Sequence, residues 1–164
     1  MDDHKPYWLC KHNALTYADL ESLAMGEAIS SDGPSVGLFR LKSGNFQVTS
    51  PGQFDAIMGN QLYTLVNTEL AHLIQGFAPE QIQYRPVQIF RRATQETWEG
   101  YSEVRFARLL QYEDYESTSC NGIQLFYMPH NMIYVSPELK ALLEPHVAAY
   151  GLTFKQELPF MVGE

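Results

Sequence analysis

The sequence predicts an α+β fold, in which a mixed, mostly antiparallel sheet is combined with short helices. Many short apolar runs are separated by turns rich in glycine, proline and asparagine, which is typical of strands. Two stretches, at 66–84 and 135–154, instead place apolar residues three and four apart behind a capping residue, which indicates short amphipathic helices. Both stretches follow the order strand, helix, strand, so we expect two similar strand–helix–strand units.

The N-terminal part of the chain is predicted to contain a strand, a helix and a hairpin. The strand is expected at 6–11, and a short amphipathic helix begins at Thr16. Strands at 36–41 and 46–49 flank four turn residues that include a glycine, which predicts a β-hairpin. A short helical turn is expected at 53–58.

The middle of the chain contains the first strand–helix–strand unit. Residues 62–66 form an apolar run, and Asn67 can cap the helix that follows it. The second strand of this unit is expected at 82–90. Residues 91–100 are polar and show no periodicity, so they are predicted to be a loop before a strand at 101–110.

The C-terminal part contains the second unit. An acidic loop is expected at 112–121, followed by a second hairpin with strands at 123–128 and 132–135. Ser136 precedes a proline and a glutamate, which is a strong signal for the start of a helix. The last strand is expected at 152–154.

The two units suggest how the chain is organised. They lie 69 residues apart through the helix and 70 apart in the following strand, although chance is an alternative because this order of elements is common. Each helix has one apolar stripe that must be buried against a sheet. We expect one globular domain over residues 1–164. The alternatives are two sub-lobes, 1–90 and 101–164, joined by the loop 91–100, and a separate lobe formed by residues 1–50.

The chain is acidic along its whole length. It carries 11 lysine and arginine against 19 aspartate and glutamate side chains, a net charge of -8. This charge argues against nucleic-acid binding and against an anionic membrane surface. It suits a basic partner attracted by electrostatic steering, and it equally suits a plain role in solubility. No apolar run approaches the about 18 residues of a membrane span, and the N-terminus lacks signal-peptide character, so we expect a cytoplasmic protein.

The second unit has a recognisable pattern. A strand ending in Val-Ser, a helix opening with Glu-Leu-Lys and a following Gly-Leu-x-Phe fall at Val135, Ser136, Glu138, Leu139, Lys140, Gly151, Leu152 and Phe154. In this pattern the chain resembles, over roughly residues 54–159, a family of immunity proteins from bacterial polymorphic toxin systems, first catalogued as a family of unknown function. The first unit matches at Val66, where Asn67 replaces the usual serine, and Asp114 with Ser117 or Ser119 is also similar. The resemblance implies a protein that binds and blocks a co-encoded toxin, and it implies no catalytic residues.

A run of acidic and aromatic residues is the candidate partner-binding surface. It comprises Tyr112, Glu113, Asp114, Tyr115 and Glu116, with Trp98 as an expected neighbour. Aromatic side chains beside carboxylates make good anchors for a partner that presents arginine and lysine. The alternative is a solvated acidic loop without a partner.

Two groups of residues are candidates for metal binding or nucleophilic chemistry. Cys10 with His4 and His12 offers only one close Cys/His pair, whereas a structural zinc site needs four ligands. Cys120 would be a nucleophile with His130 or His146 as its base, but the carboxylates near Cys120 disfavour a thiolate. The common phosphate-loop, dinucleotide, zinc-protease and nucleophile-elbow motifs are missing. We therefore expect no enzyme activity, no cofactor and no metal.

The resulting hypothesis is an immunity protein that neutralises a cognate toxin by stoichiometric occlusion, with the toxin presenting a basic surface. A small interaction module for another partner is the first alternative, and an enzyme with an unrecognised site is the second. The sequence leaves the oligomeric state open.

Overall fold

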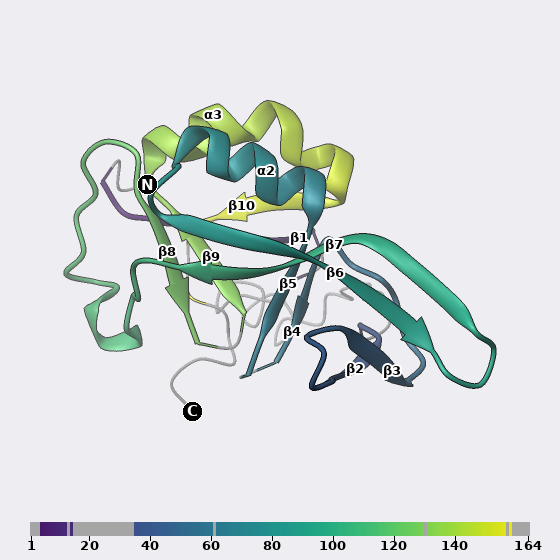
Figure 1. Ribbon diagram of the computed structural model, residues 1–164. Helices are drawn as coiled ribbons and strands as arrows, with labels where there is room; N and C mark the ends of the chain where they lie inside the picture. Colours follow the sequence, from purple (N-terminus) through teal and green to yellow (C-terminus); the bar gives the residue numbers. More distant parts are fainter. Residues whose placement is uncertain are drawn as a thin grey trace, which may run out of the picture. The chain divides into compact units, whose positions relative to one another are not determined.

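The computed structural model describes residues 4–12, 14, 35–60, 62–129, 131–156 and 158, and it has the predicted α+β architecture (Figure 1). The chain divides into two compact units. We call residues 33–107 the central unit, and residues 1–32 together with 108–164 the terminal unit. This division differs from the expected sub-lobes, because the two ends of the chain belong to one unit.

The central unit has a mixed sheet with the strand order β2-β3-β6-β7-β5-β4. Strands β3 and β6 run parallel, and the other neighbouring pairs are antiparallel. Helix α2 packs against β5, β6 and β7. The elements are β2 (Gly37–Arg40), β3 (Phe46–Ser50), β4 (Ile57–Gly59), β5 (Thr64–Asn67), α2 (Thr68–Phe77), β6 (Ile82–Arg91) and β7 (Glu96–Phe106).

The terminal unit has an antiparallel sheet with the strand order β10-β1-β9-β8. Helix α3 packs against β9 and β10, and a left-handed glycine, Gly151 with φ 73°, ends the short helix before β10. The elements are β1 (Tyr7–Lys11), η1 (Tyr112–Asp114), β8 (Leu125–Met128), β9 (Met132–Val135), α3 (Pro137–Val147), η2 (Ala148–Tyr150) and β10 (Leu152–Lys155).

The two units share one topology. The order β6-β7-β5-β4 with α2 in the central unit corresponds to β10-β1-β9-β8 with α3 in the terminal unit. Strand β1, from the start of the chain, takes the place that β7 occupies in the central unit. The cross-strand register is also the same. The equivalent pairs are Glu103 with Leu65 and Arg85 in the central unit, and Trp8 with Tyr134 and Lys155 in the terminal unit. The predicted strand–helix–strand similarity is confirmed, and it extends to two further strands.

Each sheet is covered by its helix on one face and by an apolar cluster on the other. The helices bury equivalent stripes, which are Leu70, Ala71 and Ile74 on α2 and Leu139, Leu143 and Val147 on α3. In the central unit, Phe46 and Tyr63 pack at 4.7 Å between ring centroids in a cluster with Met58 and Leu65. In the terminal unit the corresponding cluster contains Tyr134 and Tyr115. Burial of these side chains is the main driving force for each unit.

Asn67 and Ser136 cap helices α2 and α3 as predicted, but the two side chains accept different numbers of hydrogen bonds. The Oδ1 atom of Asn67 accepts the Leu70 N–H at 3.2 Å. The Oγ atom of buried Ser136 accepts two N–H groups, from Leu139 at 3.3 Å and from Gln124 at 2.9 Å, so it also ties the helix to the segment before β8.

We expect Ser136→Ala to lower the free energy of unfolding by about 2 kcal/mol, and Asn67→Ala by about 1 kcal/mol. The serine loses two hydrogen bonds, and the asparagine loses one. Urea denaturation followed by circular dichroism measures both values, and equal losses would contradict the second role of Ser136.

Most predicted elements are confirmed, and two are wrong. Residues 53–58 do not form a helical turn, because they lead into β4, which pairs with β5. Residues 91–100 are not a loop, because they form the end of β6, a turn and the start of β7, with Arg91 opposite Glu96. Both strands are largely exposed there, so their sequence shows no alternation between apolar and polar residues. The helix expected from Thr16 lies outside the described residues.

Candidate functional site

The expected partner-binding residues of the terminal unit lie on a firmly attached segment, which we call the acidic segment (residues 109–116). Its start runs beside β8. The Leu110 N–H donates to the Tyr127 carbonyl oxygen at 2.8 Å, and the Tyr127 N–H donates to the Arg108 carbonyl oxygen at 2.9 Å. Helix η1 then turns the chain, and the Ser117 hydroxyl donates to the Asp114 carbonyl oxygen at 3.2 Å. The backbone therefore presents these side chains on a defined support.

Tyr115 anchors the acidic segment and does not face a partner. Its side chain is only 2% exposed, and its ring packs edge-on against Tyr134 with 5.7 Å between centroids. This corrects the expectation that Tyr115 contacts a toxin, because the ring is already used in the core of the terminal unit. Alternating aromatic and acidic residues do not reveal from sequence which aromatic ring turns inward.

Leu110 is buried in the same cluster as Tyr115, whereas the remaining side chains of the acidic segment are accessible. Glu113, Asp114 and Glu116 are exposed, and Glu116 pairs with Lys5 Nζ. Two large apolar side chains also lie open, with Leu109 56% exposed and Tyr112 39% exposed. The segment thus combines apolar side chains with carboxylates on a single surface stretch.

Trp98 does not belong to the same unit as the acidic segment. It lies on β7 of the central unit, stacked on Phe54 with 4.7 Å between ring centroids. The Arg91 guanidinium lies 5.5 Å from the centre of a Trp98 ring. Trp98 is therefore partly buried against Phe54 and the apolar cluster of the central unit.

The described surroundings of the two cysteines are those of buried thiols. Cys10 and Cys120 are both buried, and burial raises the pKa of the Cys120 thiol, which disfavours the thiolate. His4 and His12 are exposed. Among the described residues, no group of three or more His, Cys, Asp or Glu side chains is placed to hold a metal ion. His130 lies outside the described residues.

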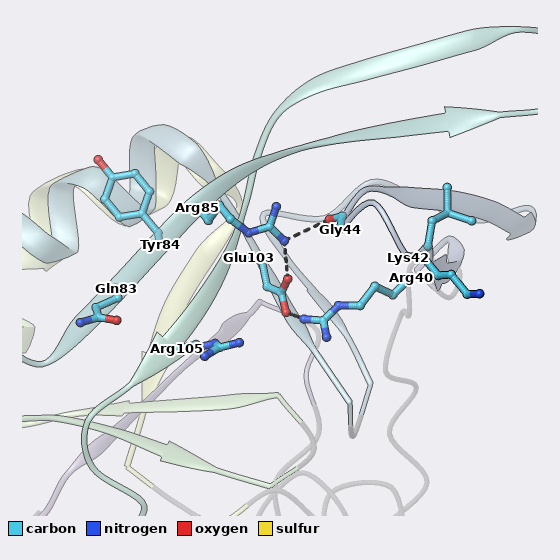
Figure 2. Close-up of a pocket in the computed structure, with 9 residues that line it drawn as sticks. Arg40, Lys42, Gly44, Gln83, Tyr84, Arg85, Glu103 and Arg105 are labelled. Carbon is cyan, nitrogen blue, oxygen red and sulfur yellow. Dashed lines mark hydrogen bonds and ion pairs between the residues drawn. The ribbon is translucent and has the colours of Figure 1, made fainter.

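A basic pocket in the central unit was not anticipated. It has a volume of about 430 Å³ and lies between the β2–β3 turn and the paired strands β6 and β7 (Figure 2). We call it the basic pocket. Its lining residues are Arg40, Leu41, Lys42, Gly44, Gln83, Tyr84, Arg85, Glu103 and Arg105.

One buried carboxylate organises the basic pocket. Glu103 is 8% exposed, and it pairs with Arg85 Nη2 at 2.9 Å and with the Arg40 guanidinium. Arg85 Nη2 also donates to the Gly44 carbonyl oxygen at 3.1 Å. Gly44 has φ +90°, and a Cβ there would come within 3.0 Å of the Arg85 guanidinium, so glycine suits both the turn and this contact.

Two further cations line the basic pocket. Arg105 lies on the same face of β7 as Glu103, and Figure 2 shows its side chain reaching toward the space beside the Arg40–Glu103 pair. In the described part of the chain, no ion pair engages Arg105 or Lys42. A sequence signal for the basic pocket exists in these strands. Arg85 follows Gln83 by two residues and Arg105 follows Glu103 by two residues, and residues two apart in a strand lie on the same face.

No helix in the described residues combines the length and apolar character that crossing a bilayer requires. Comparisons of this chain with protein-family models, with curated proteins and with solved structures gave no match in any of the three.

Proposed function

We propose that this chain is an immunity protein that binds a co-produced bacterial toxin in the cytoplasm and neutralises it by stoichiometric occlusion. The observation that carries the proposal is the exposed acidic segment on its anchored backbone. Its residues are part of the chain stretch that resembles immunity proteins of polymorphic toxin systems. The net charge of -8 adds long-range attraction toward a basic partner.

The composition of the acidic segment suits a protein interface. Leu109 and Tyr112 offer apolar contact area, and an aromatic side chain of this kind is a common anchor in interfaces. The surrounding carboxylates would meet arginine and lysine of the toxin, which favours fast association and the correct partner. Tight inhibition requires about 1,200–2,000 Å² of total buried area, so further surface must join this segment.

The anchoring of the segment favours affinity. Tyr115, buried in the core, and the hydrogen bonds to Tyr127 hold the backbone before any partner arrives. A preorganised loop loses less conformational entropy on binding than a free loop does. This difference distinguishes the segment from a solvated acidic loop that lacks such attachments.

The two carboxylates expected to contribute most are Glu113 and Asp114. Glu116 already has a partner in Lys5, so part of its charge is compensated within the chain. Reversal of Glu113 and Asp114 changes the surface charge without removing that ion pair.

The function is tested by expressing the toxin encoded beside this gene, with and without this protein. Growth restored by the protein, together with a one-to-one complex in size-exclusion chromatography, supports the proposal. Continued killing despite matched soluble expression rejects it for that toxin. Capture of a different, non-toxic partner would instead favour the interaction-module alternative.

We expect Glu113→Lys/Asp114→Lys to weaken toxin affinity by at least about 100-fold, because two attractive contacts become repulsive. Calorimetry or surface plasmon resonance measures the change. The matched control is Glu80→Lys/Glu99→Lys, which alters the net charge equally at exposed sites outside the acidic segment. Equal losses of affinity in the two double variants would show a general charge effect and would mean that the acidic segment is not the binding site.

A further inference from the structure

The described lining of the basic pocket has more cationic than anionic side chains. Four cationic side chains, Arg40, Lys42, Arg85 and Arg105, line it with a single carboxylate, Glu103. This local excess occurs in a protein whose net charge is -8. Cations placed together in a concave site repel each other, and an anion bound among them removes that repulsion.

The sheet topology does not by itself require Glu103 and Arg105. The terminal unit has the same four-strand topology and register, with Trp8 at the position of Glu103 and Cys10 at that of Arg105. Trp8 there packs against an apolar cluster. The same sheet therefore forms with Trp8 and Cys10 in place of Glu103 and Arg105, although Lys155 at the position of Arg85 is also a cation. The sheet topology alone does not explain why Glu103 and Arg105 are charged, which points to a role beyond forming the sheet.

The guanidinium groups are held ready for a ligand. Glu103 fixes Arg40 and Arg85, and the Gly44 carbonyl oxygen fixes Arg85 further. A guanidinium has five N–H donors, so each arginine retains donors beyond those used by Glu103. Arg105 and Lys42 add donors at the rim. The arrangement resembles a preformed cradle with one carboxylate as its internal support (Figure 2).

We propose that the basic pocket binds a small phosphorylated molecule through its phosphate groups. A phosphate monoester carries close to two negative charges near neutral pH and presents oxygens that match the arginine fork, whereas a carboxylate carries one charge. The volume of about 430 Å³ lies within the range of small-molecule sites.

The polar character of the lining also restricts the kind of molecule that the basic pocket can bind. Among the described residues that line the pocket, Leu41 is the only one with an aliphatic side chain. The Tyr84 hydroxyl is hydrogen-bonded to His72 Nδ1 of helix α2 at 2.9 Å. The pocket thus has little apolar surface for a large hydrophobic group. A compact, polar phosphate ester or diphosphate fits best, and the acidic surface of the chain disfavours a long nucleic acid.

The test is isothermal titration calorimetry with pyrophosphate at low ionic strength, using the full chain. We expect saturable one-to-one binding, and we expect Arg105→Gln to weaken it by about tenfold or more with an unchanged melting temperature. Arg92→Gln is the matched control, because it removes the same charge from an exposed turn between β6 and β7. The affinity of Arg92→Gln for pyrophosphate should stay within about twofold of that of the unchanged protein.

Four outcomes overturn the proposal. The first two are the absence of saturable binding at millimolar pyrophosphate and equal losses in Arg105→Gln and Arg92→Gln. The third is tighter binding of citrate than of pyrophosphate, which would indicate a carboxylate ligand. The fourth is an acidic peptide that competes better than pyrophosphate, which would indicate a protein partner. Protection against the toxin should persist in Arg105→Gln, so this inference and the proposed function fail or succeed separately.

Discussion

Replacing Tyr115 by alanine is expected to lower the free energy of unfolding by about 3–5 kcal/mol. The side chain is 2% exposed, and its ring packs against Tyr134 while Lys5 Nζ lies 5.5 Å from its centroid. Truncation would leave a cavity between the acidic segment and the sheet of the terminal unit. Urea denaturation followed by the fluorescence of Trp8, which packs against the same cluster, measures the loss.

Two controls separate the anchor from its neighbours. Tyr115→Phe keeps the ring and its packing against Tyr134, so it should change the free energy of unfolding by no more than about 1 kcal/mol. Tyr112→Ala removes an exposed ring three residues before Tyr115, and its effect on the free energy of unfolding should stay within about 0.5 kcal/mol. If Tyr115→Ala were no more destabilising than Tyr112→Ala, the anchoring of the acidic segment would be refuted.

Hydrogen exchange measures the effect of Tyr115→Ala at individual backbone amides. In Tyr115→Ala, the Leu110 and Tyr127 amides that join the acidic segment to β8 should lose protection, because the segment is no longer held against the sheet. Toxin binding should weaken in this variant even under conditions where the remaining sheet is folded. Such a result would connect preorganisation of the segment with affinity.

Local signals explain why much of the fold could be predicted from the sequence. Asn67 and Ser136 cap their helices through their own side chains, and the stripes led by Leu70 and Leu139 repeat at helical spacing. These features act within a few residues, so they are visible without tertiary structure. The strand–helix–strand similarity follows from them.

Long-range pairing explains what could not be predicted. Strand β1 occupies the place equivalent to β7 although it lies at the other end of the chain from β10, and no local pattern indicates that pairing. The β6–β7 hairpin is exposed on both faces near residues 91–100, so it lacks the alternation that identifies a strand.

The candidate sites show the same limit. The acidic segment was visible as a run of charges, but the inward orientation of Tyr115 depends on Tyr134, nineteen residues further along the chain. In the basic pocket, Arg40 pairs with Glu103, which is 63 residues further along the chain. In the sequence, each of these residues alone resembles an ordinary charged residue of a protein surface. Only the register of β6 on β7 and the position of the β2–β3 hairpin bring these groups together.

Replacing Glu103 by alanine is expected to lower the free energy of unfolding by about 2–3 kcal/mol at low ionic strength. The variant loses the carboxylate that links Arg40 on β2 and Arg85 on β6 to β7, and it leaves three guanidinium groups without an internal counter-charge. The effect should fall below the loss typical of a fully buried pair, because the Arg40 and Arg85 side chains are 41% and 53% exposed and water screens their charges.

Three comparisons identify the origin of this loss. Glu99→Ala, at an exposed site on the same strand, removes an equal charge and should change stability by no more than about 0.5 kcal/mol. The penalty of Glu103→Ala should shrink in 0.5 M NaCl and in the Arg105→Gln background, since screening or removal of a cation relieves the repulsion. Pyrophosphate should stabilise Glu103→Ala more than the unchanged protein, because the anion replaces the missing carboxylate among the arginines. A penalty that is independent of salt, Arg105 and pyrophosphate would mean that Glu103 acts through packing alone, and the electrostatic account of the basic pocket would then be wrong.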